Sequence, residues 1–145
     1  MTDEPIFDDD VTINSGSFSG QNSGSMNTSD ATSLATGESI GAGATHMYNV
    51  EFNVTLDLEP GSGGDDIYRP CSEPGNGPGS NPGEGLYNIA KLDRGSDGTD
   101  DIEDDACGDL PYVGMEKDFG SADQNPDGTY TGNYKIKVEK LGGAT

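Results

Sequence analysis

Residues His46–Leu58 read HMYNVEFNVTLDL. Apolar side chains occupy one parity of the stretch and polar side chains the other. The apolar set consists of Tyr48, Val50, Phe52, Val54, Leu56 and Leu58. Apolar residues in strict period two are typical of a half-buried β-strand, and a disordered chain has no reason to sort its residues in this way. The segment therefore predicts a folded β-domain.

Other segments repeat the same pattern. In Tyr130–Val138 the apolar parity is expected to face the core, while Lys135 and Lys137 face solvent. Gly85–Leu92 and Leu110–Lys117 are shorter β-rich runs bounded by Gly and Asp. Apolar residues do not recur with helical spacing over a useful length, so the chain is predicted to be all-β, a sandwich of two antiparallel sheets. The predicted core is Tyr48, Val50, Phe52, Val54, Leu56, Leu86, Ile89, Tyr134, Ile136 and Val138.

Long polar segments separate these runs. They are Ser15–Ser33, Pro70–Gly85 and the acidic segment Arg94–Asp105. Loops of this length are uncommon inside a compact domain unless they are functional, cross-linked or ion-bound.

The charge balance restricts the possible partners. The 145 residues carry 27 acidic and seven basic side chains, a formal net charge of −20. A chain without a basic patch cannot release phosphate counterions, so nucleic-acid binding is not expected. Membrane insertion is not expected either, because the longest uncharged stretches are rich in Ser, Thr and Gly rather than apolar.

The two cysteines, Cys71 and Cys107, favour a disulfide over two free thiols. A zinc site would need further soft ligands, and the acidic residues around Cys107 would raise the pKa of a catalytic thiol. Closing a loop of this size would stabilise the fold by roughly 3 to 4 kcal/mol. A disulfide also indicates an extracellular location.

Acidic clusters suggest calcium as an ion partner. Asp123–Gly128 (DQNPDG) matches the first half of a calcium-binding loop, although Tyr134 stands where the bidentate acid is expected. The same residues fit a plain hairpin turn, and both interpretations stay open. Further acidic residues gather in Arg94–Asp105, at Asp8–Asp10 and at Asp65–Asp66. The candidate calcium ligands are Asp123, Asn125, Asp127, Asp100, Asp101 and Asp104. A high-salt habitat explains such a surface without any ion.

The sequence gives little support for an enzymatic function. Carboxylates are abundant, but no tryptophan or aromatic cluster supplies the apolar pocket that a glycosidase acid needs. The single histidine, His46, reads as a residue at a strand end rather than as a catalytic base. We therefore expect no catalytic residues.

Three pairs of stretches carry a resemblance to a known family. They are Leu34–Ser39 with Ala44–Val50, Gly85–Ala90 with Asp105–Pro111, and Glu116–Asp118 with Gln124–Tyr130. Together they resemble the DUF11-like, immunoglobulin-like repeats of very large bacterial surface proteins and adhesins. The resemblance covers most of the chain from about Leu34 onward. It implies an immunoglobulin-like β-sandwich, tandem arrays and an extracellular spacer or adhesive role.

The resemblance also bears on domain organisation. Residues 1–145 are expected to form one sandwich module cut out of phase with the family repeat, because 110–145 resembles the hairpin that opens a unit. This hairpin is expected either to pack on its own chain or to complete a neighbouring copy by strand addition. The function expected is a structural spacer or fibre element. The alternative is a module that binds carbohydrate or a protein partner through its loops.

Overall fold

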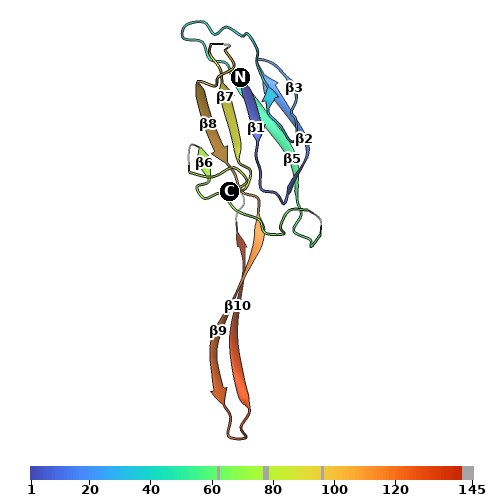
Figure 1. Cartoon of the computed structure of the whole chain (residues 1–145), viewed down its shortest axis with the longest axis vertical. Coiled ribbons are helices and arrows are strands. Elements are labelled where there is room, and N and C mark those ends of the chain that lie inside the picture. Colours follow the sequence, from blue (N-terminus) through green and yellow to red (C-terminus); the bar gives the residue numbers. More distant parts are fainter. Residues whose placement is uncertain (62, 77–78, 96, 142–145) are drawn as a thin grey trace. The chain divides into compact units, whose positions relative to one another are not determined.

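A computed structural model describes residues 1–61, 63–76, 79–95 and 97–141 (Figure 1). All strand pairs in this part of the chain are antiparallel and it contains no helix, which confirms the predicted all-β class. It therefore holds no helix that could cross a membrane. Two compact units form, Met1–Leu110 and Pro111–Thr145. The reading of the chain as one out-of-phase module stays a prediction, and Ser62, Gly77, Pro78, Ser96 and 142–145 lie outside the described residues.

The first unit contains a five-stranded and a three-stranded sheet. The five-stranded order is β4-β1-β7-β8-β6 and the three-stranded order is β3-β2-β5. The immunoglobulin-like strand order stays a prediction. The first sheet is built from β1 (Thr2–Pro5), β4 (Thr32–Ser33), β6 (Gly75–Asn76), β7 (Asn88–Leu92) and β8 (Ile102–Cys107), and the second from β2 (Val11–Gly20), β3 (Gly24–Ser25) and β5 (Tyr48–Leu56).

The predicted strand His46–Leu58 is β5, and its burial alternates as expected. Every second residue from Tyr48 to Leu56 is partly buried and the residues between them are exposed. β5 pairs with β2 along its whole length, from Val11 opposite Leu56 to Gly20 opposite Tyr48. The expectation of a polar loop from Ser15 was wrong, because β2 continues through Gly20. Backbone pairing with β5 does not require apolar side chains, so the alternation that marks β5 is absent from β2.

Two apolar clusters hold the unit together. Phe18, Met26 and Leu34 form the first, with Tyr48, Val50 and Phe52 packed against it. It joins β2 and β5 to the end of the other sheet at β4. The second cluster contains Tyr87 and the disulfide between Cys71 and Cys107, with Ile6 and Ile89 against it. The predicted disulfide is thus confirmed, and it links two residues 36 positions apart in the sequence.

The second unit is a two-stranded hairpin of β9 (Tyr112–Gln124) and β10 (Tyr130–Leu141). The strands pair from Tyr130 opposite Gln124 to Leu141 opposite Tyr112, with one irregularity between Asn133 and Tyr134. The prediction that Tyr134, Ile136 and Val138 belong to the core was wrong, because all three side chains are exposed. Alternation along the strand is present, but no described residue covers the apolar face.

Candidate functional site

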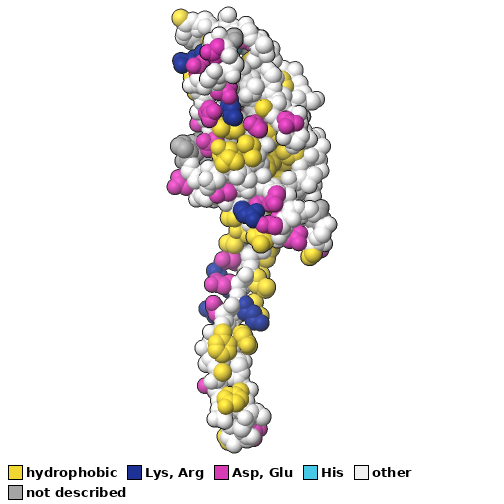
Figure 2. Space-filling model, in the orientation of Figure 1, with side chains coloured by type: hydrophobic (Ala, Val, Ile, Leu, Met, Phe, Trp, Pro, Cys, Tyr) yellow, Lys and Arg dark blue, Asp and Glu magenta, His cyan; other side chains and the backbone are white. Residues whose placement is uncertain are grey.

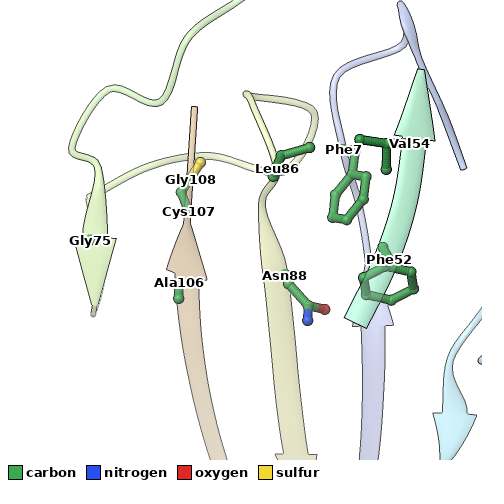
Figure 3. A pocket seen from close by; sticks show the side chains of 9 residues that line it. All are labelled: Phe7, Phe52, Val54, Gly75, Leu86, Asn88, Ala106, Cys107 and Gly108. Atoms are coloured by element: carbon green, nitrogen blue, oxygen red, sulfur yellow. The ribbon is translucent and has the colours of Figure 1, made fainter. Parts of the chain in front are cut away.

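A cavity of about 410 Å³ lies between the two sheets of the first unit. Phe52 and Val54 of β5 line one side together with Phe7, whose ring meets that of Phe52 edge to face at 5.3 Å. Leu86 and Asn88 line the other side (Figure 3). The remaining lining residues are Gly75, Ala106, Cys107 and Gly108. The cavity is therefore mostly apolar and opens where the smaller sheet ends at β5.

Asn88 is the polar side chain of this cavity. Its amide nitrogen donates to both carboxylate oxygens of the buried Asp3, at 3.2 and 3.0 Å. Burial raises the pKa of the Asp3 carboxyl, and the hydrogen bond from Asn88 works against that shift. The Asn88 carbonyl oxygen is buried and has no partner among the described residues, and Figure 3 shows this side chain projecting toward Phe52.

One face of β8 is left uncovered. Ala106 lines the cavity, and residues two and four positions earlier, Asp104 and Ile102, share its face because strand side chains alternate. All three are exposed, Ile102 to 46%. The three-stranded sheet therefore covers the β4 side of the larger sheet but not its β8 side.

The edge of the smaller sheet beside this uncovered face is open. In the described part of the chain, β5 pairs with β2 alone, so the backbone along its other edge has no strand partner. A nine-residue open edge is a template for a further strand.

The hairpin has one apolar face. Residues directly opposite each other in the two strands share a face, and these pairs include Met115 with Val138 and Phe119 with Tyr134. The rings of Phe119 and Tyr134 meet at 5.3 Å. The large apolar residues of this face are 59% to 74% exposed; they are Val113, Met115, Phe119, Tyr134, Ile136 and Val138. Figure 2 shows hydrophobic side chains along the surface of the hairpin.

The charged residues of the hairpin divide between its faces. Lys117 and Lys140 lie on the apolar face, opposite Ile136 and Val113. The Lys117 ammonium sits 4.6 Å from the centre of the Tyr134 ring. The other face pairs lysines with acids, Lys135 with Asp118 and Lys137 with Glu116. The charged side chains on the apolar face are therefore both lysines.

The two units differ sharply in charge. Residues 111–145 hold four of the seven basic side chains but only five of the 27 acidic ones, whereas residues 1–110 hold 22 acidic and three basic side chains. Nearly all of the net charge of −20 thus belongs to the first unit.

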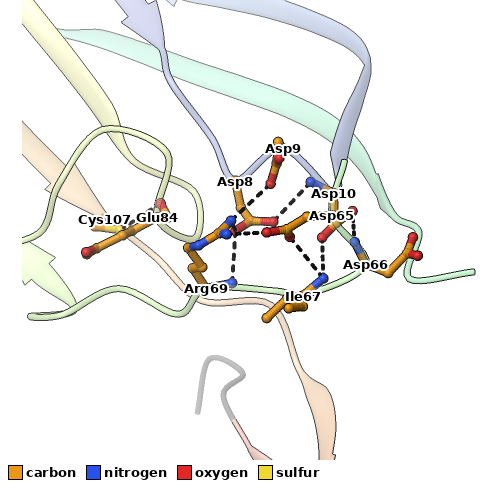
Figure 4. A network of polar contacts seen from close by, with 9 residues as sticks. All are labelled: Asp8, Asp9, Asp10, Asp65, Asp66, Ile67, Arg69, Glu84 and Cys107. Carbon is orange, nitrogen blue, oxygen red and sulfur yellow. Dashed lines mark hydrogen bonds and ion pairs between the residues drawn. The ribbon is translucent and has the colours of Figure 1, made fainter. Parts of the chain in front are cut away.

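A carboxylate network joins two of the acidic clusters noted in the sequence (Figure 4). Asp8 accepts hydrogen bonds from the backbone N–H of Asp10 at 3.0 Å and of Arg69 at 2.9 Å. Asp10 accepts from the N–H groups of Asp66 and Ile67. The Arg69 guanidinium pairs with Asp9 at 3.2 Å and with Asp65. Burial raises the pKa of the Asp8 carboxyl, the hydrogen bonds lower it, and the charges of Asp9 and Asp10 raise it further.

The role of Arg69 was not foreseen. It is the first Lys or Arg of the sequence and closely follows Asp65 and Asp66, and that isolation is the signal that points to it. With Asp8 and Asp10 it fastens the loop after β5 to the turn before β2. The network acts as a structural tie.

The predicted calcium ligands fall into two separate places. Asp127 accepts hydrogen bonds from the N–H and hydroxyl of Thr129, and the Asn125 amide donates to the Thr129 and Thr131 hydroxyls, so these residues form the hairpin turn. Asp123 lies at the end of β9.

The second predicted ligand set is also dispersed. Asp104 lies in β8 rather than in a loop, while Asp100 and Asp101 precede that strand, and Asp101 contacts Arg94. Among the described residues, the one group of three acidic ligand atoms within 4.8 Å of one another is Asp8, Asp9 and Asp10. Calcium binding by the six predicted residues stays a prediction.

Glu84 organises the loop that precedes β7. Its carboxylate accepts hydrogen bonds from the side chain and backbone N–H of Asn81, at 2.8 and 3.1 Å, and from the backbone N–H and hydroxyl of Ser72, both at 2.8 Å. These bonds, led by the one from the Asn81 side chain, lower the pKa of Glu84 to about 2. The carboxylate holds Ser72, the neighbour of Cys71, against the loop.

Comparison with known proteins adds no relative to this description. No family model, curated protein or solved structure matches the chain.

Proposed function

We propose that this chain is a non-enzymatic structural module of a secreted or surface-anchored bacterial protein, and that it assembles with neighbouring copies as a spacer or fibre element. The apolar face of the hairpin carries this proposal. Full burial of one such side chain is worth roughly 1.5 to 3 kcal/mol, and association costs roughly 4 to 15 kcal/mol. The six side chains are about two-thirds exposed, so burying what remains would supply about 6 to 12 kcal/mol, which is comparable with that cost and supports assembly.

The disulfide supports the extracellular part of the proposal. Disulfides persist in oxidising compartments and are rare in the cytosol. The bond between Cys71 and Cys107 ties the loop that carries Ser72 to the end of β8. The resemblance to surface-protein repeats points in the same direction.

Sedimentation velocity of the full chain over a range of concentrations tests the assembly. We expect the wild type to form oligomers, and a variant with Ile136→Glu and Val138→Glu to stay monomeric, because two carboxylates on the apolar face cannot be buried against a partner. Lys135→Glu makes the same change in net charge on the opposite face of the hairpin, and this control should assemble as the wild type does. A wild type that is monomeric at every concentration would refute the proposal.

A second candidate function rests on the exposed ring pair of Phe119 and Tyr134. Exposed aromatic faces stack on sugars, so the same surface suits a carbohydrate-binding module. Binding of the wild type to a glycan array, lost on Tyr134→Ala, would favour this candidate. If the wild type binds no glycan on the array but does self-associate, the structural role is favoured.

A further inference from the structure

The two sheets of the first unit differ by two strands, and the hairpin supplies two. The larger sheet has five strands and the smaller has three. The first apolar cluster places β2 and β5 over the β4 and β1 side, so the missing positions lie over β8 and β6. The exposed face of Ile102, Asp104 and Ala106 and the open edge of β5 border these positions.

We propose that the hairpin of a second copy of this chain fills this gap, adding β9 and β10 to the open edge of β5 and placing its apolar face on β8 and the cavity. This proposal rests on the function proposed above and names the surface that receives the hairpin. The result would be a sandwich with five strands in each sheet. The added strands would cover the partly buried residues of β5, which alternate from Tyr48 to Leu56, on the side where β5 now has no neighbour.

The chemistry of the two surfaces matches. The cavity is lined by Phe7, Phe52, Val54 and Leu86, and the hairpin offers aliphatic and aromatic side chains. The charged groups on the apolar face of the hairpin are Lys117 and Lys140, and the charged group on the uncovered face of β8 is Asp104. The unpartnered Asn88 oxygen is a further acceptor for a lysine.

Charge over the whole surface favours a second copy of this chain as the occupant. The hairpin is nearly neutral and holds four of the seven basic residues, whereas the first unit is strongly acidic. A hairpin-to-hairpin contact would bring lysines together, and a contact between two first units would bring carboxylates together. When the apolar face of one copy's hairpin docks on the first unit of the next, Lys117 and Lys140 meet an acidic surface. Such a head-to-tail contact leaves a free hairpin and a free groove at the two ends and so propagates, into a filament unless the rotation between copies closes a ring.

The test uses two full-length variants with complementary defects. Asp104→Lys alters the receiving face at an exposed position, and Ile136→Glu with Val138→Glu alters the hairpin. Glu51→Lys makes the same charge change as Asp104→Lys on the outer face of β5 and serves as the control. Circular dichroism and the melting temperature verify that each variant is folded.

In sedimentation velocity, we expect each defective variant to be monomeric alone, with at least a tenfold weaker association than the wild type and the control. An equimolar mixture of the two defective variants should form heterodimers and nothing larger, because only one intact hairpin and one intact groove remain.

Normal assembly of Asp104→Lys would overturn the proposed groove while leaving assembly through the hairpin intact. Failure of the two variants to pair when mixed would overturn it as well, because an intact hairpin and an intact groove would then not bind each other. A monomeric wild type, with the hairpin packed on its own chain, would overturn both this inference and the proposed function.

Discussion

At the scale of single residues, Asp8 shows how an acidic chain uses a buried charge. Its side chain is only 1% exposed, and its two carboxylate oxygens serve two different backbone N–H groups, those of Asp10 and Arg69. Burial raises the pKa of this carboxyl more than the two hydrogen bonds lower it, yet removing the carboxylate would leave buried N–H groups without an acceptor.

We predict that Asp8→Asn lowers the free energy of unfolding by about 1 to 3 kcal/mol, because an amide offers one acceptor oxygen where two N–H groups need one each. Urea unfolding followed by circular dichroism measures the change. The control is Asp9→Asn, which removes an exposed partner of Arg69 and should cost at most about 0.5 kcal/mol. Equal losses in both variants would show that Asp8 acts only through its charge.

Among single residues, Glu84 gives the clearest prediction of how folding stability depends on pH. Its pKa is lowered to about 2 in the folded protein from an ordinary value of 4.5. Its contribution to stability is thus complete above pH 4.5 and is lost as the pH falls from there toward 2. We expect the melting temperature of the wild type to exceed that of Glu84→Gln at pH 6, and the difference to shrink as the solution is acidified through this window.

Asp3 and Asp8 affect the pH dependence of stability in the opposite direction to Glu84, because burial raises the pKa of each. Their folded forms hold the proton more tightly than the unfolded chain, so they favour folding as the pH falls. Both are common to the wild type and Glu84→Gln, and their effect cancels in the comparison. A difference in melting temperature that stays constant from pH 6 to pH 2 would contradict the lowered pKa of Glu84.

At the scale of elements, the pairing of β2 with β5 depends on small residues in β2. Gly16 lies opposite Phe52, and a Cβ atom there would come within 2.7 Å of both the Met26 Cβ and the Phe52 Cδ1. The serine- and glycine-rich composition of β2 lets the ring of Phe52 and the first apolar cluster approach the strand backbone.

We therefore predict that Gly16→Ala destabilises the first unit by about 1 to 3 kcal/mol, as overpacking of a closely packed contact does. Gly41→Ala is the control, since a Cβ atom at Gly41 meets nothing within 4 Å. Thermal unfolding of both variants measures the effect. A melting temperature of Gly16→Ala equal to that of the control would show that the Phe52 ring moves aside without cost.

The elements also show what can be read from a sequence. Alternation identified β5 and β10 correctly, and the two cysteines identified the disulfide. Alternation reports that a strand has an apolar face but not what covers it, so Tyr134, Ile136 and Val138 were assigned to a core that they do not enter. The full length of β2 was not predicted, because this strand contributes backbone pairing rather than an apolar face. The network around Arg69 was not predicted either, because it joins residues 60 positions apart in the sequence.

At the scale of the whole molecule, the net charge of −20 opposes compaction. The repulsion among 22 carboxylates in the first unit is long-ranged in dilute buffer and is screened within about 3 Å at 1 M salt. Added salt is therefore expected to stabilise the folded chain by screening this repulsion.

We predict that raising NaCl from 10 mM to 1 M increases the melting temperature by about 5 °C, corresponding to roughly 1 kcal/mol for a domain of this size. Thermal unfolding in CaCl₂ and in MgCl₂ at matched ionic strength, and in chelator, separates screening from binding. A rise specific to calcium that is lost in Asp127→Asn would support the hairpin turn as an ion site. Equal curves for the two divalent salts would mean that the acidic residues are solvated surface.

The disulfide has a mechanical consequence for a chain that serves as a spacer. When such a chain is pulled from its two ends, the segment between the linked cysteines, which stand 36 positions apart, cannot be drawn out, even after every sheet has opened. At about 3.4 Å per extended residue this segment represents about 120 Å of hidden length. The oxidised chain thus limits how far it lengthens under tension, and reduction of one covalent bond releases that reserve.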